Sequence, residues 1–203
     1  MKICVIGNGS SNSLYSKNTD KFNLTICCNI PQHGFKWDVI SIIDPQPVRI
    51  IKDRKLNLGK IWCPPDTHRT ATSQKLLGNW EPVYKRKSWY NSGLLSVDYV
   101  CQEYKNLEEI HLWGFNSLYE DSFHSQMDNL VPRKRKKNLN KHWVPKWKEV
   151  VSKYPSVTFY AHIPSDENLK EDYRNIINFL GYYHSSKEEK ISNESVYYRK
   201  WSF

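Results

Sequence analysis

The chain has 203 residues, 39% hydrophobic content and a formal net charge of +9 at pH 7, which suits one globular domain and excludes a disordered chain. Its five cysteines include one adjacent pair and no CxxC spacing, which argues against a disulfide framework and a structural zinc site. No apolar run reaches the length of a signal peptide or a membrane span, so we expect a soluble, cytoplasmic protein. The basic balance favours nucleotides, nucleic acid or a peripheral anionic membrane surface as partners.

Short apolar runs alternate with amphipathic segments along the chain. They predict strands at residues 2–6, 22–28, 39–43 and 60–63, a helix at 92–104, a strand at 109–113, a helix at 143–154, a strand at 157–163, a helix at 169–180 and a last strand, at a sheet edge, at 196–201. Residues 67–88 have weak periodicity and predict a helix followed by an irregular connection. Strands that alternate with helices predict an α/β fold: a single Rossmann-like domain over residues 1–203, with a mostly parallel sheet and helices on both faces.

Residues 117–141 form a long polar segment that contains the basic tract around Arg133, Lys134 and Arg135. A connection of this length inside a compact domain is usually functional or disordered. We expect it to be a flexible basic lid whose cations contact a nucleotide's phosphates or the acceptor. The alternative is a run of charge that only faces solvent.

A glycine turn directly follows the first predicted strand and includes Asn8, Gly9 and Ser10. Glycines allow backbone N–H groups to approach a phosphate closely, and Asn and Ser side chains add donors. The turn is not a GxGxxG fingerprint, because Asn12 stands where the last glycine would be, and no GK[ST] follows it. An ordinary tight turn is the alternative interpretation.

Further candidates lie at the ends of other predicted elements. Asn29 ends the second strand, where it could hydrogen-bond a ribose or a base edge or simply form a turn. Ser92 and Gly93 open a helix; Ser is a good N-cap by type, and a capped helix start is also an anion site. Gly114, Phe115 and Asn116 directly follow the strand predicted at 109–113.

His142 stands between the basic segment and the helix at 143–154. Histidine can act as a general base near neutral pH, although most of the seven histidines are expected to be structural or exposed. The sequence contains no DxD triplet, the carboxylate pair that commonly holds a metal-bound diphosphate in nucleotide-sugar enzymes, and its histidines are not clustered at ligand spacing. We therefore expect a site that works without a metal.

The ordered motifs GNGSS, CN, SG and GF, followed by a His before a helix, resemble those of the sialyltransferases. They are most similar to the bacterial family that decorates lipooligosaccharide, in which the pattern runs GNGPS, CN, SG and GIDF. Residues 91–115 are also similar to the small sialylmotif of the animal enzymes, with its TGLL and YGF ends. The resemblance covers roughly residues 1–30 and 90–165. Ser10 replaces the family's Pro, and Asn116 replaces its Asp.

The resemblance implies an inverting, metal-independent glycosyltransferase that moves a sugar from a CMP-linked donor to a hydroxyl of a glycan or another acceptor, without a further cofactor. His142 would be the general base, and Tyr119 would hydrogen-bond the leaving phosphate. The segment 117–141 would be the lid. The cytidine nucleotide would be bound by Asn8, Gly9, Ser10, Asn29, Ser92, Gly93, Gly114, Phe115 and Asn116. Two alternatives stay open: an enzyme of this fold that acts on nucleic acid, and a nucleotide-binding protein without catalysis.

Overall fold

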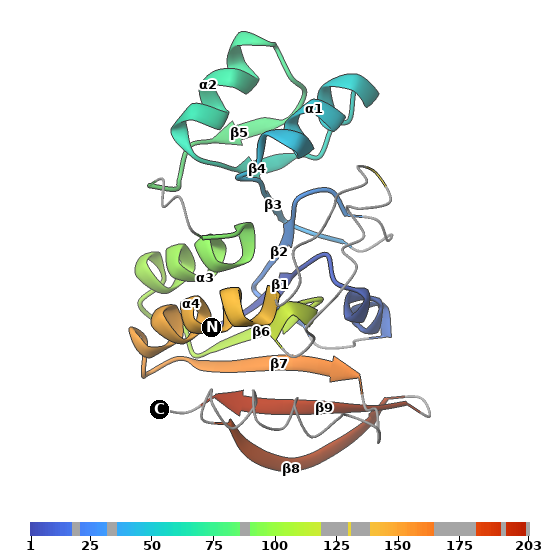
Figure 1. Cartoon of the computed structure of the whole chain (residues 1–203), viewed down its shortest axis with the longest axis vertical. Helices are drawn as coiled ribbons and strands as arrows, with labels where there is room; N and C mark the ends of the chain where they lie inside the picture. Colours follow the sequence, from blue (N-terminus) through green and yellow to red (C-terminus); the bar gives the residue numbers. More distant parts are fainter. Residues whose placement is uncertain are drawn as a thin grey trace.

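The computed structural model describes residues 1–17, 21–31, 36–85, 90–118, 130, 139–164, 182–191 and 194–201. Its centre is one nine-stranded sheet with the order β5-β4-β3-β2-β1-β6-β7-β9-β8 (Figure 1). The strands are β1 (Lys2–Ile6), β2 (Leu24–Cys28), β3 (Val39–Ser41), β4 (Lys60–Trp62), β5 (Asn79–Glu81), β6 (Glu109–Trp113), β7 (Thr158–Pro164), β8 (Tyr182–Ile191) and β9 (Glu194–Trp201).

The seven strands from β5 to β7 all run parallel, and β9 and β8 are antiparallel additions beside β7. This confirms the predicted α/β fold with a mostly parallel sheet. The strand order reverses at β1, which pairs with β2 on one side and with β6 on the other. The chain builds outward from β1 to β5 and then returns to place β6 against the opposite side of β1.

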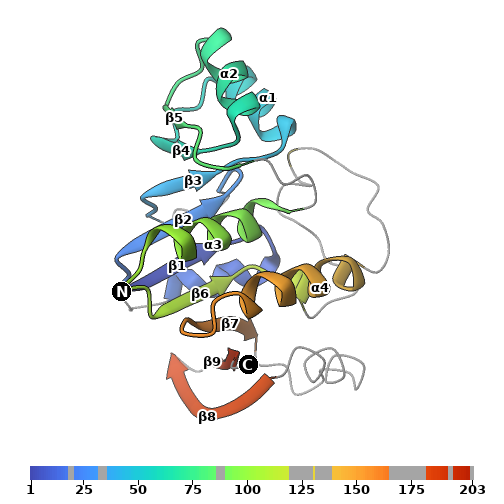
Figure 2. The same cartoon turned by 90° about the vertical axis from the view of Figure 1, so that its left-hand side faces the viewer.

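Helices cover both faces of the sheet, as predicted (Figure 2). The side chains of β1 alternate: Ile3 and Val5 join the hydrophobic cluster under α3 (Ser92–Glu103) and α4 (Leu139–Ser152). Cys4 and Ile6 join the cluster on the other face, which includes residues of α1 (Pro45–Arg54) and α2 (Pro65–Ser73). Because β1 is buried on both faces, its sequence is a continuous apolar run rather than an alternating one.

Several sequence predictions are corrected by the structure. Helix α1 was not predicted, because prolines interrupt its pattern, although Pro45 at the first helical position is compatible with a helix. Residues 79–81 form the edge strand β5 instead of an irregular connection. Strand β9 lies between β7 and β8 and not at the edge, and β8 itself was not predicted. The helix expected at 169–180 lies outside the described residues.

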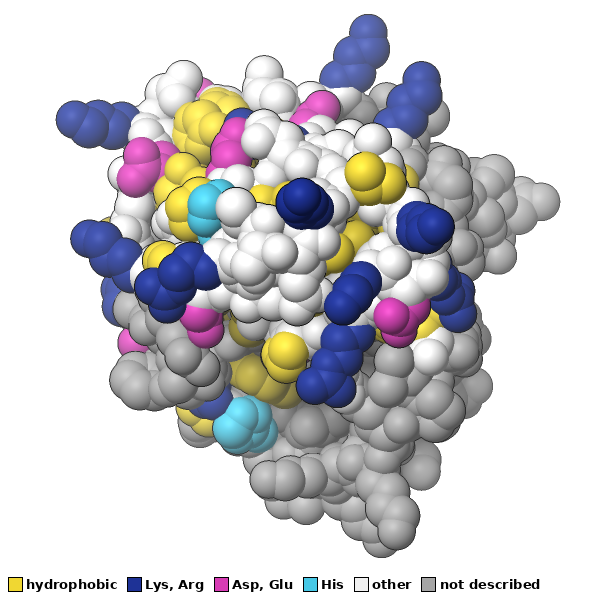
Figure 3. All heavy atoms as spheres, turned by 90° about the horizontal axis from the view of Figure 1, so that it is seen from above, with side chains coloured by type: hydrophobic (Ala, Val, Ile, Leu, Met, Phe, Trp, Pro, Cys, Tyr) yellow, Lys and Arg dark blue, Asp and Glu magenta, His cyan; other side chains and the backbone are white. Residues whose placement is uncertain are grey.

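The surface at the α1 and α2 end of the molecule is rich in basic side chains, with a few carboxylates between them (Figure 3). Its exposed cations include Arg49, Lys52 and Arg54 on α1 and Arg69 on α2. Within the described residues, no helix combines the length and apolar character needed to cross a membrane.

Candidate functional site

The carboxyl ends of β1 and β6 lie side by side at the point where the strand order reverses (Figure 1). In open parallel sheets, this switch point is where ligands commonly bind, because the loops after the two strands diverge. Gly7 directly follows β1, and Gly114 directly follows β6. The structure therefore brings together two sequence motifs that are about a hundred residues apart.

The two loops, Gly7–Asn12 and Gly114–Asn116, hereafter the glycine loops, are bonded to each other through their backbones. The Gly7 N–H donates to the Trp113 carbonyl at 2.7 Å, and the Gly9 N–H donates to the Gly114 carbonyl at 2.8 Å. A Cβ atom on Gly7 would lie 2.5 Å from the Gly114 oxygen, so the approach requires glycine there. Gly114 also has a φ of +72°, in the left-handed region that favours glycine.

Asn116 is the side chain that joins the glycine loops. Its Oδ1 accepts hydrogen bonds from the Ser11 N–H at 3.2 Å and the Ser11 hydroxyl at 2.8 Å. Its Nδ2 donates to the Ser10 hydroxyl at 3.1 Å. Asn116 has 1% of its surface exposed and is a buried link between the loops, whereas Ser10 is exposed and Asn8 is half-buried.

Asn8 of the first glycine loop forms a second row of polar groups with Asn29 and Ser92. Asn8 Nδ2 donates to the Cys28 carbonyl at 2.8 Å, which ties the first loop to the end of β2. Asn29 follows with a φ of +58°, a left-handed conformation that Asn tolerates better than most residues. The Ser92 hydroxyl donates to Asn29 Oδ1 at 3.4 Å. Three sequence-predicted residues from three different segments are thus neighbours.

Helix α3 begins at Ser92, as predicted, but its N-cap lies one residue earlier than the sequence interpretation placed it. Asn91 is the N-cap, and its Oδ1 accepts from the Leu94 N–H at 2.9 Å. Ser92 is the first helical residue, so its hydroxyl is left to face Asn29. The Ser92 carbonyl is held by the hydroxyls of Ser41 at 3.1 Å and Ser96 at 2.8 Å.

Tyr84 completes this buried hydroxyl network, which no sequence motif indicated. Its hydroxyl donates to Ser41 at 2.8 Å and lies 3.1 Å from the Ser96 hydroxyl. Burial raises the pKa of Tyr84, so the phenol stays neutral and can serve as a structural donor. The network fixes the start of α3 against β3.

Gly93 and Phe115 belong to the packing beneath the site. A Cβ atom on Gly93 would overlap the Phe115 ring, so the missing side chain lets that ring lie against the helix start. Phe115 in turn meets Trp147 of α4 edge to face, with ring centroids 5.2 Å apart. Both residues are buried, and they connect the end of β6 with α3 and α4.

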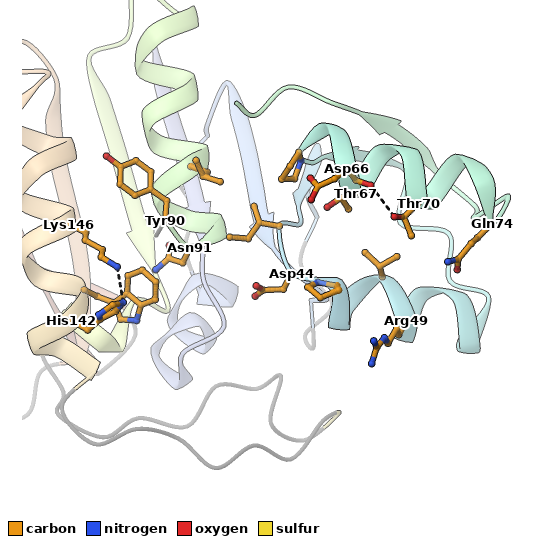
Figure 4. Close-up of a pocket in the computed structure, with 16 residues that line it drawn as sticks. Asp44, Arg49, Asp66, Thr67, Thr70, Gln74, Tyr90, Asn91, His142 and Lys146 are labelled. Atoms are coloured by element: carbon orange, nitrogen blue, oxygen red, sulfur yellow. Dashed lines mark hydrogen bonds between the residues drawn. The ribbon is translucent and has the colours of Figure 1, made fainter. Parts of the chain in front are cut away.

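A cavity of about 880 Å³ opens next to the second row of polar groups, among the amino-terminal ends of α1, α2 and α3 and the first turns of α4 (Figure 4). We call it the helix-end cavity. Asn91 lines it from α3, and His142 and Lys146 line it from α4. Figure 4 shows Asp66, Thr67, Thr70 and Gln74 along α2 on the opposite side, Arg49 on α1, and Asp44 between these residues and those of α3 and α4.

His142 is exposed at this cavity and contacts two neighbours on its own helix. The Lys146 ammonium lies 2.8 Å from His142 Nε2, so this nitrogen is the acceptor and a neutral ring carries its proton on Nδ1. Partial burial lowers the pKa of Lys146. The Trp143 ring meets His142 edge to face at 4.7 Å. Lys146 and Trp143 therefore hold the His142 ring where it lines the cavity, near the carboxyl ends of the strands.

The predicted site residues thus fall into three groups. The glycine loops, Asn29, Ser92 and Gly93 gather at the carboxyl edge of the sheet, and His142 lines the adjoining cavity. Tyr119, Arg133, Lys134 and Arg135 lie outside the described residues, as does most of the expected lid. Sequence reasoning missed Asp44, Asp66, Thr67, Thr70, Gln74 and Lys146. Asp44 and Asp66 follow the strand ends at residues 41 and 62 within a few positions, which was the signal that could have indicated them.

Among the described residues, no group of three His, Cys, Asp or Glu side chains is placed to hold a metal ion. Four cysteines are buried and therefore poorly placed to act as nucleophiles: Cys4, Cys27, Cys28 and Cys63. Burial raises the pKa of the Cys27 and Cys63 thiols to about 12, which keeps them protonated near neutral pH.

Compared with known proteins, the chain matches no family model, no curated protein and no solved structure.

Proposed function

We propose that this protein is a glycosyltransferase of the sialyltransferase kind, which transfers a sugar from a CMP-linked donor to an acceptor hydroxyl. One observation carries the proposal: the four short motifs GNGSS, CN, SG and GFN, scattered over more than a hundred residues, meet at the switch point of a parallel sheet. Open parallel sheets commonly bind ligands at this point, which supports a binding site here. The cytidine assignment follows from the resemblance of the motifs.

In the proposed complex, the exposed polar atoms of Asn8 and Ser10 face the nucleotide's phosphate, and Asn29 and Ser92 face the nucleoside. The glycine loops bring backbone groups close to the phosphate without a side chain in between. Their mutual hydrogen bonds hold this surface in place before the ligand arrives, which lowers the entropy cost of binding.

His142 is the proposed general base. It would remove the proton from an acceptor hydroxyl while that oxygen bonds to the donor's anomeric carbon. The bond from this carbon to the phosphate oxygen breaks at the same time, and CMP leaves with the electron pair. Tyr119 and the cations Arg133, Lys134 and Arg135 would balance the charge of the leaving phosphate, as the resemblance implies.

The first test is a panel of nucleotides followed by thermal unfolding, in the presence of EDTA. CMP at a hundred times its Kd should stabilise the fold by about 2.7 kcal/mol, and UMP, AMP and GMP should have much smaller effects. Asn29→Ala and Ser92→Ala should reduce the CMP effect. The matched control Asn57→Ala, in the turn before β4, should not. A panel in which CMP gives no shift would rule out the proposal.

A second candidate, nucleotide binding without transfer, is favoured by the contact between Lys146 and His142. The ammonium occupies the Nε2 lone pair that a general base would use. The two candidates are separated by CMP release from a CMP-linked sialic acid. Transfer predicts that His142→Ala abolishes release and leaves CMP binding intact. Binding without transfer predicts no release by the unaltered protein.

A further inference from the structure

The end of the molecule formed by α1, α2 and the turns that follow them has an excess of positive charge (Figure 3). Residues 45–79 contain seven Lys or Arg and two Asp or Glu. Lys60 pairs with Glu81 at 3.1 Å, and Arg49 lines the helix-end cavity. The other five are exposed and form no ion pair with any residue that the structure describes; we call them the basic end: Lys52, Arg54, Lys55, Arg69 and Lys75.

The dipoles of the helices explain only part of this charge. Lys52 and Arg54 lie in the last turn of α1, where cations offset the partial negative charge of the helix end. Lys55 follows them with a φ of +50°, and Lys75 follows α2 with a φ of +51°. Gly or Asn adopts this left-handed conformation with less strain than Lys does. Since two cations already offset the dipole of α1, a third one at a strained position indicates a partner outside the helix.

Leu77 adds an exposed apolar side chain to the same surface. It has 50% of its surface exposed, and no other large hydrophobic side chain of the described residues is classed as exposed. Its carbonyl accepts a hydrogen bond from the Trp80 indole at 3.1 Å, and the Asn79 N–H donates to the Gly59 carbonyl at 2.7 Å. The turn between α2 and β5 is therefore held in place at the outer end of the molecule (Figure 1), while the Leu77 side chain stays in contact with water.

A lipid bilayer fits this combination better than a nucleic acid does. Proteins that bind single strands combine cations with exposed aromatic rings on which bases stack, whereas Trp62 of β4 and Trp80 of β5 are buried. A duplex presents its phosphates to the protein, so Leu77 would remain in water. An anionic bilayer attracts the cations and also takes up an apolar side chain beneath its headgroups.

We propose that the basic end and Leu77 form a surface for reversible docking on an anionic membrane. The cations lie at the lipid headgroups, and the Leu77 side chain enters the boundary between headgroups and acyl chains. The proposal is independent of the proposed glycosyl transfer, because none of these residues lines the helix-end cavity or belongs to the glycine loops. One apolar side chain is a weak anchor, so the charges should dominate and high salt should release the protein.

The test is co-sedimentation of the full-length protein with vesicles of phosphatidylcholine alone and of phosphatidylcholine mixed with phosphatidylglycerol. At low salt, the protein should bind the mixed vesicles and not the neutral ones. Lys52→Gln, Lys55→Gln and Lys75→Gln should each weaken this binding by about fivefold, and all three together by about a hundredfold. Leu77→Ser should weaken it several-fold without changing its salt dependence, because this substitution removes apolar contact and no charge.

The matched control is Lys105→Gln, which removes an exposed lysine outside the basic end and should leave binding unchanged. Thermal unfolding of each variant checks that it is folded. The proposal is wrong if neutral vesicles bind equally well, if the triply substituted protein still binds the mixed vesicles, or if Leu77→Ser has no effect. The same variants are titrated with duplex DNA and RNA. Duplex binding that requires these lysines, without vesicle binding, would identify a nucleic-acid surface and overturn the proposal.

Discussion

The glycine loops and the helix-end cavity are neighbours at the same edge of the sheet, yet they use their polar groups in opposite ways. In the glycine loops, backbone and side-chain groups are bonded to each other, and Asn116 is 1% exposed. In the cavity, the exposed side chains of Asp44 and Gln74 come from the ends of two different helices, α1 and α2. The polar groups of the glycine loops mainly bond to one another and stabilise the loops. The cavity has exposed polar side chains that a ligand can reach. Substitutions of the buried residues in the glycine loops should therefore affect stability, and substitutions of the exposed residues in the cavity should affect binding more than stability.

The largest difference is expected from alanine at two glycines that have the same φ angle. Gly114 and Gly59 both have a φ of +72°, but a Cβ atom would lie 2.6 Å from the Gly7 oxygen at Gly114 and would meet nothing within 4 Å at Gly59. Gly59→Ala should cost about 1 kcal/mol for the left-handed conformation. Gly114→Ala adds a backbone overlap and should cost about 3 kcal/mol in total. Urea unfolding measures both, and equal losses would show that the glycine loops are not tightly packed.

The next effect is expected at Asn116. Asn116→Ala removes the acceptor of both the Ser11 N–H and the Ser11 hydroxyl inside a buried site, which should lower the free energy of unfolding by about 2 kcal/mol. Ser10→Ala removes only the exposed end of the network and should cost less than about 0.5 kcal/mol. If Asn116→Ala is as mild as Ser10→Ala, Asn116 does not join the loops.

Acid should weaken the region of the glycine loops through His162. This ring stacks on Trp113 with centroids 3.5 Å apart, and the Trp113 carbonyl accepts the Gly7 N–H. Burial, and next the neighbouring His111, lower the pKa of His162 well below its usual range. The unfolded chain then binds a proton that the folded one does not, so stability is complete above about pH 6.5 and falls below it. The slope for one proton is at most about 1.4 kcal/mol per pH unit.

Chemical unfolding between pH 7 and pH 5 measures this slope. His162→Gln, which cannot take up a proton in this range, should make it shallower. A variant that keeps the slope of the original protein would assign the acid sensitivity to other groups.

The smallest stability effects are expected in the helix-end cavity. Thr70→Ala and Asp66→Asn change exposed or half-buried groups, and each should alter the free energy of unfolding by about 0.5 kcal/mol or less. Losses above about 1.5 kcal/mol would mean that the cavity wall is part of the structural framework and would remove the contrast with the glycine loops.

The sequence predicted the centre of the sheet well and its surroundings less well, for physical reasons. Strand β1 matches its predicted residues because it is buried on both faces and is a nearly continuous apolar run. Strand β6 matches because Ile110 and Leu112 alternate with polar residues, which is the pattern of a strand. The sequence pattern did not predict helix α1, because prolines and charged residues interrupt its short apolar stripe. Sequence composition also could not show that β9 has a further neighbour in β8, since pairing between strands depends on the fold.

For the candidate site, motifs next to strand ends could be found because parallel strands place their carboxyl ends at one edge. The bonds of Asn116 could not, because they join Ser11 to a residue 105 positions away. The same holds for the cavity. Asp44 and Asp66 follow strands in the sequence, but their common wall depends on the directions in which α1 and α2 leave the sheet.

The pairing of β1 with β6 sets an order of events for a chain leaving the ribosome. Strand β1 is made first and can pair with β2 soon afterwards, but its other edge stays open until β6 has emerged. The Ser11 N–H likewise has no Asn116 Oδ1 to donate to until that residue has been made. Folding of the central sheet should therefore be late and dominated by contacts that are distant in sequence, which slows it and leaves an apolar edge uncovered for much of synthesis. Binding of chaperones to the nascent chain is expected to be strongest before residue 116 has emerged from the ribosome.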